Sequence, residues 1–325
     1  MTTYSPAAFH PLYQERLHLL DGVPAPSVDD TPESLARRHA FDAPFADPDL
    51  PVVDTEEREV PGPNGPVRVR LYRRVGSTSQ PSPALVWIHG GAFMHGDIDV
   101  PEADHFARVM ANRTDTVVIS VAYRLCDEHT HLPVPHDDCY AVYTWVRQHS
   151  AELDVDPSRL AVGGGSAGAN LAASVALHAG ETGQKPWQML LAYPVVHPTL
   201  PPASPELRAA LAMTPDAIRY RADAGDRINE FVMGRPLSGA TPYDFPALAS
   251  DVTKFPPAYI ENSEFDELRA SGEAFAAQLE AAGVDVEMVT APGVPHGHLN
   301  AVGSPMLEDA YGRFARRLER GSLHA

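Results

Sequence analysis

Residues 159–172 read Arg-Leu-Ala-Val-Gly-Gly-Gly-Ser-Ala-Gly-Ala-Asn-Leu-Ala. A short apolar stretch, Leu160 to Val162, runs into three glycines, one serine and then residues that favour a helix. Ser166 lies at the centre of a G-x-S-x-G pattern, which between a strand and a helix forms a sharp turn that raises the serine hydroxyl above the sheet. The neighbours of the serine must be small in so tight a turn. The segment therefore predicts an α/β fold with Ser166 at a strand end.

Short apolar runs separated by helical patterns occur along the rest of the chain. Residues 52–60 and 67–75 alternate apolar and polar side chains, which predicts an antiparallel pair of strands. Most of the later runs lack this alternation, as strands buried on both faces of a parallel sheet do. They cover residues 84–88, 117–121, 160–162, 189–193, 258–260 and 284–289. Strands that alternate with helices predict a mostly parallel central sheet flanked by helices.

One connection is far longer than a crossover between parallel strands needs. It joins residues 189–193 to 258–260, and its own helical patterns cover 206–212, 214–223 and 227–234. We expect this insertion to form a helical cap over the carboxyl ends of the strands, joined by N-terminal helices at 6–20 and 31–41. The predicted division is 1–45 and 198–250 for the cap, and 46–197 and 251–325 for the two parts of the core.

Composition excludes several classes of protein. The 325 residues carry a formal net charge of −18 and no basic patch, which argues against nucleic acid as a partner. No run approaches the ~18 apolar residues of a membrane span. Residues 1–10 lack the basic and apolar regions of a signal peptide, so we expect a cytoplasmic protein. Cys126 and Cys139 are expected to be free thiols in that compartment, with a disulfide between them as the alternative.

A serine at such a turn needs a base to activate it and a group to orient that base. His296 follows the predicted strand 284–289 in a loop of glycines and prolines, and His298 is the alternative base. Asp266 follows the predicted strand 258–260; its alternative role is to cap the next helix. The order serine, aspartate, histidine is the one found in α/β-hydrolases.

Donors for a developing oxyanion are predicted beside the serine. His89 to Phe93 directly follow the buried run 84–88, and the N–H groups of Gly90 and Gly91 can enter the site because no side chain intervenes. With the N–H of Ala167 they would supply three donors.

Two other interpretations compete for these residues. Residues 163–168 also fit G-x-G-x-x-G, but a dinucleotide site needs an acidic residue at the end of the next strand, and 192–195 contain none. Histidines and aspartates gather between 129 and 138 without the spacing of a zinc site. We therefore expect neither a metal nor a cofactor.

Four motifs together resemble the hormone-sensitive-lipase-like group of α/β-hydrolase esterases, from Pro83 to Arg317. They are His89 to Phe93; Tyr123 to Leu125 with Glu128-His129; the Ser166 turn with Asn170 to Ala172; and Asp266 to Arg269 with Val294 to Gly297. The resemblance implies ester hydrolysis without a cofactor. The implied roles are nucleophile Ser166, acid Asp266, base His296, and oxyanion donors Gly90, Gly91 and Ala167. The chain departs from the group at Gly165, where an acidic residue is usual, and at Ala169, where glycine is common.

We therefore predict a serine carboxylesterase that hydrolyses short- to medium-chain acyl esters of small molecules through an acyl-enzyme. The alternatives are a non-catalytic ligand-binding protein on the same fold, and an amidase or lactonase that uses the same three side chains. A homodimer through the last strand and helix is expected from the family. The candidate pocket residues are Phe93, Tyr193, Met213, Ile218 and Phe231.

Overall fold

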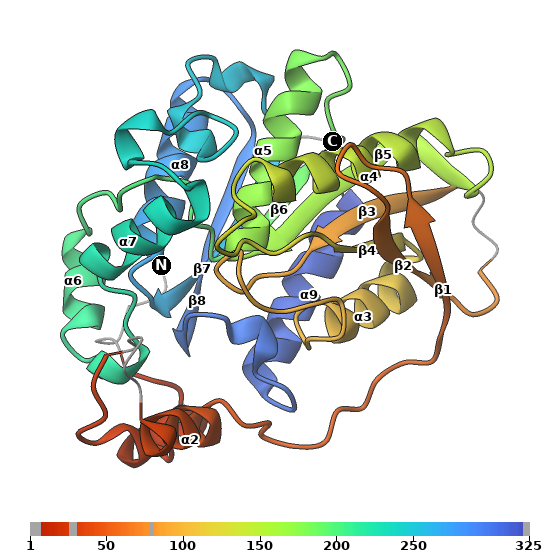
Figure 1. Ribbon diagram of the computed structural model, residues 1–325. Coiled ribbons are helices and arrows are strands. Elements are labelled where there is room, and N and C mark those ends of the chain that lie inside the picture. The colour runs from red at the N-terminus through yellow and green to blue at the C-terminus, as the bar shows by residue number, and fades with distance from the viewer. Residues whose placement is uncertain (1–7, 26–30, 78–80, 321–325) are drawn as a thin grey trace.

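The computed structural model describes residues 8–25, 31–77 and 81–320. Within them eight strands form one sheet in the order β1-β2-β4-β3-β5-β6-β7-β8 (Figure 1). β2 runs antiparallel to β1 and β4, and the other neighbouring strands are parallel, as predicted. The strands are β1 (Val53–Val60), β2 (Val67–Arg74), β3 (Ser82–Ile88), β4 (Val117–Ala122), β5 (Val155–Gly165), β6 (Met189–Ala192), β7 (Ala258–Phe265) and β8 (Val286–Pro295).

Helices cover both faces of this sheet. α4 (Val134–Gln148), α5 (Ala167–Glu181) and α8 (Arg269–Ala281) pack on one face, and α3 (Asp104–Thr114) and α9 (Pro305–Arg320) pack on the other (Figure 1). On the second face the ring of Trp87 in β3 stacks on Phe106 of α3, with 3.8 Å between ring centroids. Each helix buries the apolar stripe that its sequence period provides.

The register of the parallel strands brings their carboxyl ends to one edge of the sheet. Ile88 of β3 pairs with Gly164 of β5, and Gly165 pairs with Ala192 of β6. Phe265 of β7 pairs with Pro295 of β8. The turns that follow β3, β5, β7 and β8 therefore meet at this edge, which is where open α/β sheets bind ligands.

The N-terminal region forms shorter helices than predicted. Of the predicted helix 6–20, residues 6 and 7 lie outside the described residues, and the rest forms α1 (Pro11–Gln14) and the 3₁₀ turn η1 (Leu17–Leu20). The gap of five residues between Leu12 and Leu17 does not fit the helical period. α2 (Pro32–Phe41) is confirmed, with the Thr31 hydroxyl accepting the Ser34 N–H at 3.1 Å.

In the long insertion, α6 (Pro205–Leu211) and α7 (Ala222–Met233) correspond to predicted helices, but the prediction of a helix over 214–223 is wrong. Before α7 begins at Ala222, only the 3₁₀ turn η2 (Asp216–Ile218) forms in this range. Glu267 accepts the Arg219 Nε–H at 2.5 Å and the Tyr220 N–H at 3.2 Å, which holds this stretch extended. Further 3₁₀ turns between α7 and β7 are η3 (Leu237–Gly239), η4 (Pro246–Leu248) and η5 (Val252–Lys254). Outside the insertion, η6 (His298–Asn300) follows β8.

The N-terminal elements pack against the insertion and the sheet. Phe9 stacks on Phe265 at the end of β7, with 3.9 Å between ring centroids. Arg38 of α2 donates from Nε to the carbonyl of Ala217 at 3.0 Å. These contacts hold the N-terminal region against the insertion and the carboxyl edge of the sheet.

Within the described part of the chain, no helix has both the length and the apolar character needed to cross a bilayer. Cys126 and Cys139 are free and buried thiols. The histidines between 129 and 138 diverge: His131 contacts the Phe231 carbonyl, whereas the His136 ring stacks near Tyr140. Among the described residues, no group of three or more histidine, cysteine or acidic side chains could hold a metal ion.

Candidate active site

Ser166 lies in the turn between β5 and α5 with φ 53° and ψ −117°, a region that non-glycine residues rarely adopt. Its N–H donates to the Ala192 carbonyl at 2.9 Å. A Cβ atom at Gly164 would lie 2.4 Å from the Ile88 carbonyl oxygen, and one at Gly168 would lie 2.1 Å from the same atom. The tight turn thus requires glycine on both sides because backbone of β3 fills the space.

A Cβ that close to a backbone carbonyl cannot be relieved by rotating a side chain. We expect Gly168→Ala to lower the free energy of unfolding by about 4 kcal/mol, in the range of the most damaging single substitutions. Chemical denaturation would measure it. Ala169→Gly in the next position is the matched control and should cost only about 1 kcal/mol, the usual effect of glycine in a helix. Equal stabilities of the two variants would contradict this description of the turn.

Two further side chains complete a line of hydrogen bonds from Ser166. His296, directly after β8, has Nε2 at 3.0 Å from the Ser166 Oγ. Its Nδ1 lies 2.6 Å from Oδ2 of Asp266, directly after β7. The other oxygen of Asp266 accepts the Leu268 N–H at 2.9 Å in the turn before α8, whose N-cap residue is Leu268 and not the aspartate.

His298, the alternative base, lies elsewhere. Its side chain is fully buried, with Nε2 at 2.9 Å from Oε1 of Glu261 and Nδ1 at 2.8 Å from the Ser263 Oγ. Both ring nitrogens are engaged by these partners. Of the two histidines, His296 therefore faces Ser166.

Ser166 and His296 open onto a cavity of about 440 Å³. Small-molecule sites in proteins usually span about 300–1,000 Å³. Phe93 and Tyr193 also line the cavity, and the His296 ring lies between Tyr193 and Tyr220, 4.9 and 4.8 Å from their centroids. A serine and a histidine on the wall of such a cavity, with a buried carboxylate hydrogen-bonded to the histidine, can perform acyl transfer.

Comparison with known proteins identifies the family of this chain. A family model described as the alpha/beta hydrolase fold matches residues 85–300. The chain is 37% identical over 285 residues to carboxylesterase NlhH of Mycobacterium tuberculosis, with 85% of each chain covered. Esterase LipI of the same species is 34% identical over 295 residues, with 88% of each covered. The chain belongs to the α/β-hydrolase family.

Solved structures of α/β-hydrolases support the assignment over nearly the whole chain. A hyperthermophilic esterase from the archaeon Pyrobaculum calidifontis has a TM-score of 0.80 and 30% identity, covering 96% of this chain and 98% of that chain. The matched residues 85–300 contain the turn after β3, Ser166, Asp266 and His296. The resemblance predicted from the four motifs is confirmed at the level of the family.

The turn after β3 in this α/β-hydrolase differs from the prediction. The N–H of Gly90, which was predicted to be an oxyanion donor, donates to Oε1 of Glu102 in the structure. Gly91 and Ala92 line the cavity instead, with φ angles of 117° and 53°. Nothing in residues 89–93 reveals that a carboxylate further along the chain binds the first of these N–H groups.

Three of the five predicted pocket residues do not line the cavity of this α/β-hydrolase. Phe93 and Tyr193 do so, as predicted. Met213 and Phe231 are 58% and 42% exposed on the insertion, and Ile218 packs against the N-terminal cluster. Met213, Ile218 and Phe231 were predicted from their apolar character within the insertion. Apolar character does not determine which face of each segment is directed toward Ser166.

Several residues that line the cavity were not predicted from the sequence. They come from the N-terminal region, the insertion, and the turns that follow β7 and β8. For those in the N-terminal region and the insertion, the position in a cap segment was a signal, but the orientation depends on tertiary contacts such as the one between Glu267 and the Tyr220 backbone. The residues are Tyr13, Asp42, Tyr220, Ile228, Asn229, Leu268 and Asn300.

The electrostatics of the α/β-hydrolase site favour the charged form of His296. Burial by itself lowers the pKa of this imidazole, but the adjacent Asp266 carboxylate, helped by Glu102 and Glu267, outweighs burial and raises the pKa above its usual value. A base at this position must be neutral to accept a proton. The pKa of His296 therefore sets the acidic limit of any reaction that uses it.

We expect kcat/KM for an ester to fall as the pH drops through the pKa of His296. Because that pKa is raised, the acidic limb should lie above the ~6.5 of an unperturbed histidine. Initial rates with a neutral p-nitrophenyl ester, measured across buffers of constant ionic strength, would give the profile. A profile that stays flat from acidic to neutral pH would contradict His296 as the base.

Proposed function

We propose that the protein is a serine carboxylesterase in which Ser166 is the nucleophile, His296 the general base and Asp266 the residue that orients it. The observation that carries the proposal is the line of contacts from Ser166 Oγ to His296 Nε2 at 3.0 Å and from His296 Nδ1 to Asp266 at 2.6 Å. The family and the relatives named as carboxylesterases and esterases support the same activity.

In the proposed reaction His296 accepts the hydroxyl proton of Ser166, which attacks the ester carbonyl. Asp266 holds the imidazole with Nδ1–H toward itself and stabilises the imidazolium that forms. The alcohol leaves with the proton from His296, and water activated by the same histidine then hydrolyses the acyl-enzyme.

The oxyanion is held by the N–H groups of Gly91, Ala92 and Ala167 in this proposal. Gly91 and Ala92 line the cavity. Ala167 is the first residue of α5, and the first N–H groups of a helix have no partner within the helix. The partial positive charge of the helix N-terminus adds to their effect.

The cavity supports uncharged esters of modest size as substrates. Among the described residues that line it, none is lysine or arginine, and the charged ones are Asp42, Glu102 and Asp226. An anionic substrate would therefore meet like charges. Residues 1–45 and 198–250 act as the cap in this proposal, since Tyr13 and Asp42 line the cavity from the first segment and Tyr220 and Asn229 from the second.

The volume of about 440 Å³ leads to a prediction on chain length. We expect kcat/KM for p-nitrophenyl esters to be highest with short to medium acyl chains and to fall steeply toward palmitate, since a long chain cannot be enclosed. The series from acetate to palmitate, assayed below the micelle concentration, would measure it. A maximum at palmitate would contradict an enclosed acyl site.

Covalent labelling tests the proposed function directly. A fluorophosphonate should modify Ser166 stoichiometrically and abolish hydrolysis of p-nitrophenyl butyrate, with the labelled peptide identified by mass spectrometry. A non-catalytic binding protein would show neither effect. Matched anilide and lactone substrates distinguish an amidase or a lactonase from an esterase, and faster turnover of either would change the assigned substrate class.

A further inference from the structure

Glu102 is a buried carboxylate beside the site, on the connection between β3 and α3. Only 4% of its surface is exposed. Its backbone is held on both sides, because its carbonyl accepts the Trp87 Nε1–H at 2.7 Å and its N–H donates to Oδ1 of Asn300 at 3.1 Å. A charged side chain at such a depth is costly unless specific partners receive it.

Those partners come from three different parts of the site. Oε1 of Glu102 accepts the N–H of Gly90, in the turn after β3. Oε2 accepts the Tyr193 hydroxyl at 2.5 Å, at the end of β6, and the Asn300 Nδ2–H at 3.4 Å, in η6. One carboxylate thus joins the oxyanion turn to the segments that flank His296.

Two glycines of the site leave room for this carboxylate. A Cβ atom at Gly165, the residue before the nucleophile, would lie 2.7 Å from Oε2 of Glu102. A Cβ atom at Gly90 would lie 2.5 Å from Oε1. The unusual glycine at position 165 therefore has a physical reason, since the side chain of Glu102 fills the space beside it.

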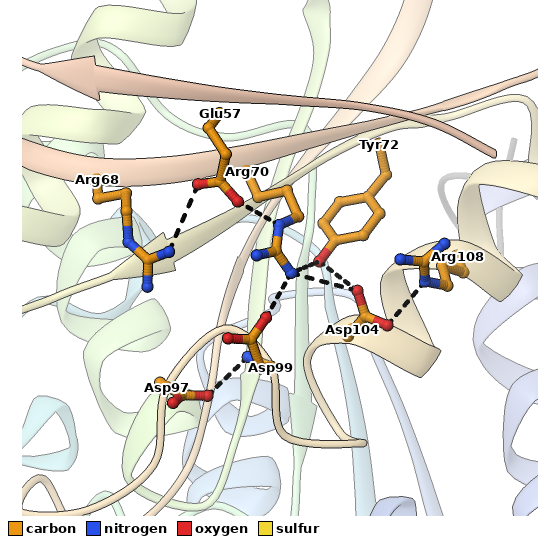
Figure 2. A network of polar contacts seen from close by, with 8 residues as sticks. All are labelled: Glu57, Arg68, Arg70, Tyr72, Asp97, Asp99, Asp104 and Arg108. Carbon is orange, nitrogen blue, oxygen red and sulfur yellow. Dashed lines mark hydrogen bonds and ion pairs between the residues drawn. The ribbon is translucent and has the colours of Figure 1, made fainter.

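The connection that carries Glu102 is fixed from outside by a network of ion pairs (Figure 2). Arg70 of β2 contacts Asp99 at 2.6 Å, and the Tyr72 hydroxyl of β2 donates to Asp104 at 2.9 Å. Arg108 of α3 contacts the other oxygen of Asp104 at 2.7 Å. Glu102 lies between these two anchored aspartates in the sequence, so its own position is constrained from both sides.

We propose that Glu102 is a positioning residue of the active site, which fixes the turn at Gly90 so that the N–H groups of Gly91 and Ala92 face the oxyanion. This inference rests on the proposed esterase function. Through its bond to the Tyr193 hydroxyl, Glu102 also orients the ring that packs edge-on against His296, 4.9 Å between centroids. Preorganised donors of this kind act without reorganisation during the reaction.

The charge of Glu102 has a second consequence. It is one of the carboxylates that raise the pKa of His296, after the larger effects of burial and Asp266. Removing the charge while keeping the shape should therefore move the acidic limb of the pH–rate profile to lower pH. A purely structural role for Glu102 would leave that limb in place.

Two substitutions separate shape from charge. Glu102→Gln keeps an acceptor for the Gly90 N–H, and we expect kcat to fall about tenfold, as when a charge-assisted hydrogen bond becomes neutral, with KM unchanged. Its acidic limb should shift downward. Glu102→Ala removes the acceptor, and kcat should fall about 100-fold, the effect of a small misplacement of catalytic groups. Asp97→Asn, an exposed carboxylate on the same connection, is the matched control and should keep wild-type kinetics.

A rescue experiment distinguishes positioning from loss of folding. In the double variant Glu102→Ala with Gly165→Asp, the new carboxylate enters the space left by Glu102 and can accept the Gly90 N–H. We expect its kcat to exceed that of Glu102→Ala by about tenfold. Gly165→Asp alone should be impaired, because it places two carboxylates against each other. Thermal unfolding of each variant verifies that the compared proteins are folded.

The inference is overturned if Glu102→Gln and Glu102→Ala keep wild-type kcat and pH profile. It is also overturned if kcat falls while the acidic limb stays in place and the double variant shows no recovery. Hydrolysis and labelling of the wild-type protein test the proposed function. The ratio of kcat in each variant to kcat in the wild type tests the role of Glu102. An inactive, unlabelled wild type would refute the esterase assignment and the role of Glu102 with it.

Discussion

Ser166→Ala is expected to lower kcat for ester hydrolysis by about 10⁶-fold and to abolish fluorophosphonate labelling, as removal of a serine nucleophile does in other hydrolases. In the wild type, Nε2 of His296 lies 3.0 Å from the Ser166 hydroxyl. The alanine leaves His296 with no hydroxyl to deprotonate. Since Ser166 has a positive φ already imposed by its neighbours, alanine should be tolerated there without loss of the fold. Initial rates with p-nitrophenyl butyrate would measure the effect.

The chain offers a matched control in a second serine bonded to a histidine. Ser263 Oγ lies 2.8 Å from His298 Nδ1, and Glu261 lies 2.9 Å from the other ring nitrogen. This group resembles the first in its residue types but is fully buried. Ser263→Ala should therefore keep both turnover and labelling. Turnover in Ser166→Ala that persists after titration with a fluorophosphonate would contradict Ser166 as the nucleophile. Loss of labelling in Ser263→Ala would also contradict it.

Asp266→Asn is expected to reduce kcat by about 10⁴-fold through the tautomer of His296. The asparagine Oδ1 can still accept the Leu268 N–H, so the start of α8 is retained. Its amide then donates to Nδ1 of His296, which places the ring proton on Nε2. A protonated Nε2 directed at Ser166 cannot accept the hydroxyl proton. Single-turnover and steady-state rates would locate the loss in the chemical step.

Asp251→Asn is the control for the loss of a carboxylate that accepts a backbone N–H two residues further on. Asp251 Oδ1 accepts the Thr253 N–H at 3.1 Å at the start of η5, without a histidine partner. This variant should retain wild-type kcat. If Asp266→Asn kept more than a small fraction of activity while remaining folded, Asp266 would only stabilise the turn before α8 and the base would need another orienting group.

The order of motifs along the chain predicted which side chains come together. The turn at Ser166, the strand before Asp266 and the strand before His296 were each recognisable, and parallel strands carry their carboxyl ends to one edge. The structure places these side chains within hydrogen-bond distance of one another. Their catalytic roles are the predictions that the substitutions above test.

The backbone departs from its predicted conformation where contacts between distant residues determine it. The helix expected over 214–223 has adequate periodicity, yet Glu267 binds Arg219 and the Tyr220 backbone and keeps the segment extended. The same contact explains why Tyr220, rather than Ile218, reaches the cavity. Local propensity is a weak preference that a buried carboxylate with two partners overrides.

The sequence by itself determined the fold class and the turn at Ser166, because both follow from short-range rules: the period of apolar residues, and the lack of space for side chains at Gly164 and Gly168. Only the tertiary structure decided which N–H groups face the cavity. That choice depends on Glu102, which reaches back to Gly90 at the start of its own connection and into the space beside Gly165 at the end of β5. The approach of Glu102 to Gly165 leaves no periodic signal in the sequence, since it exists only when β3 and β5 are paired.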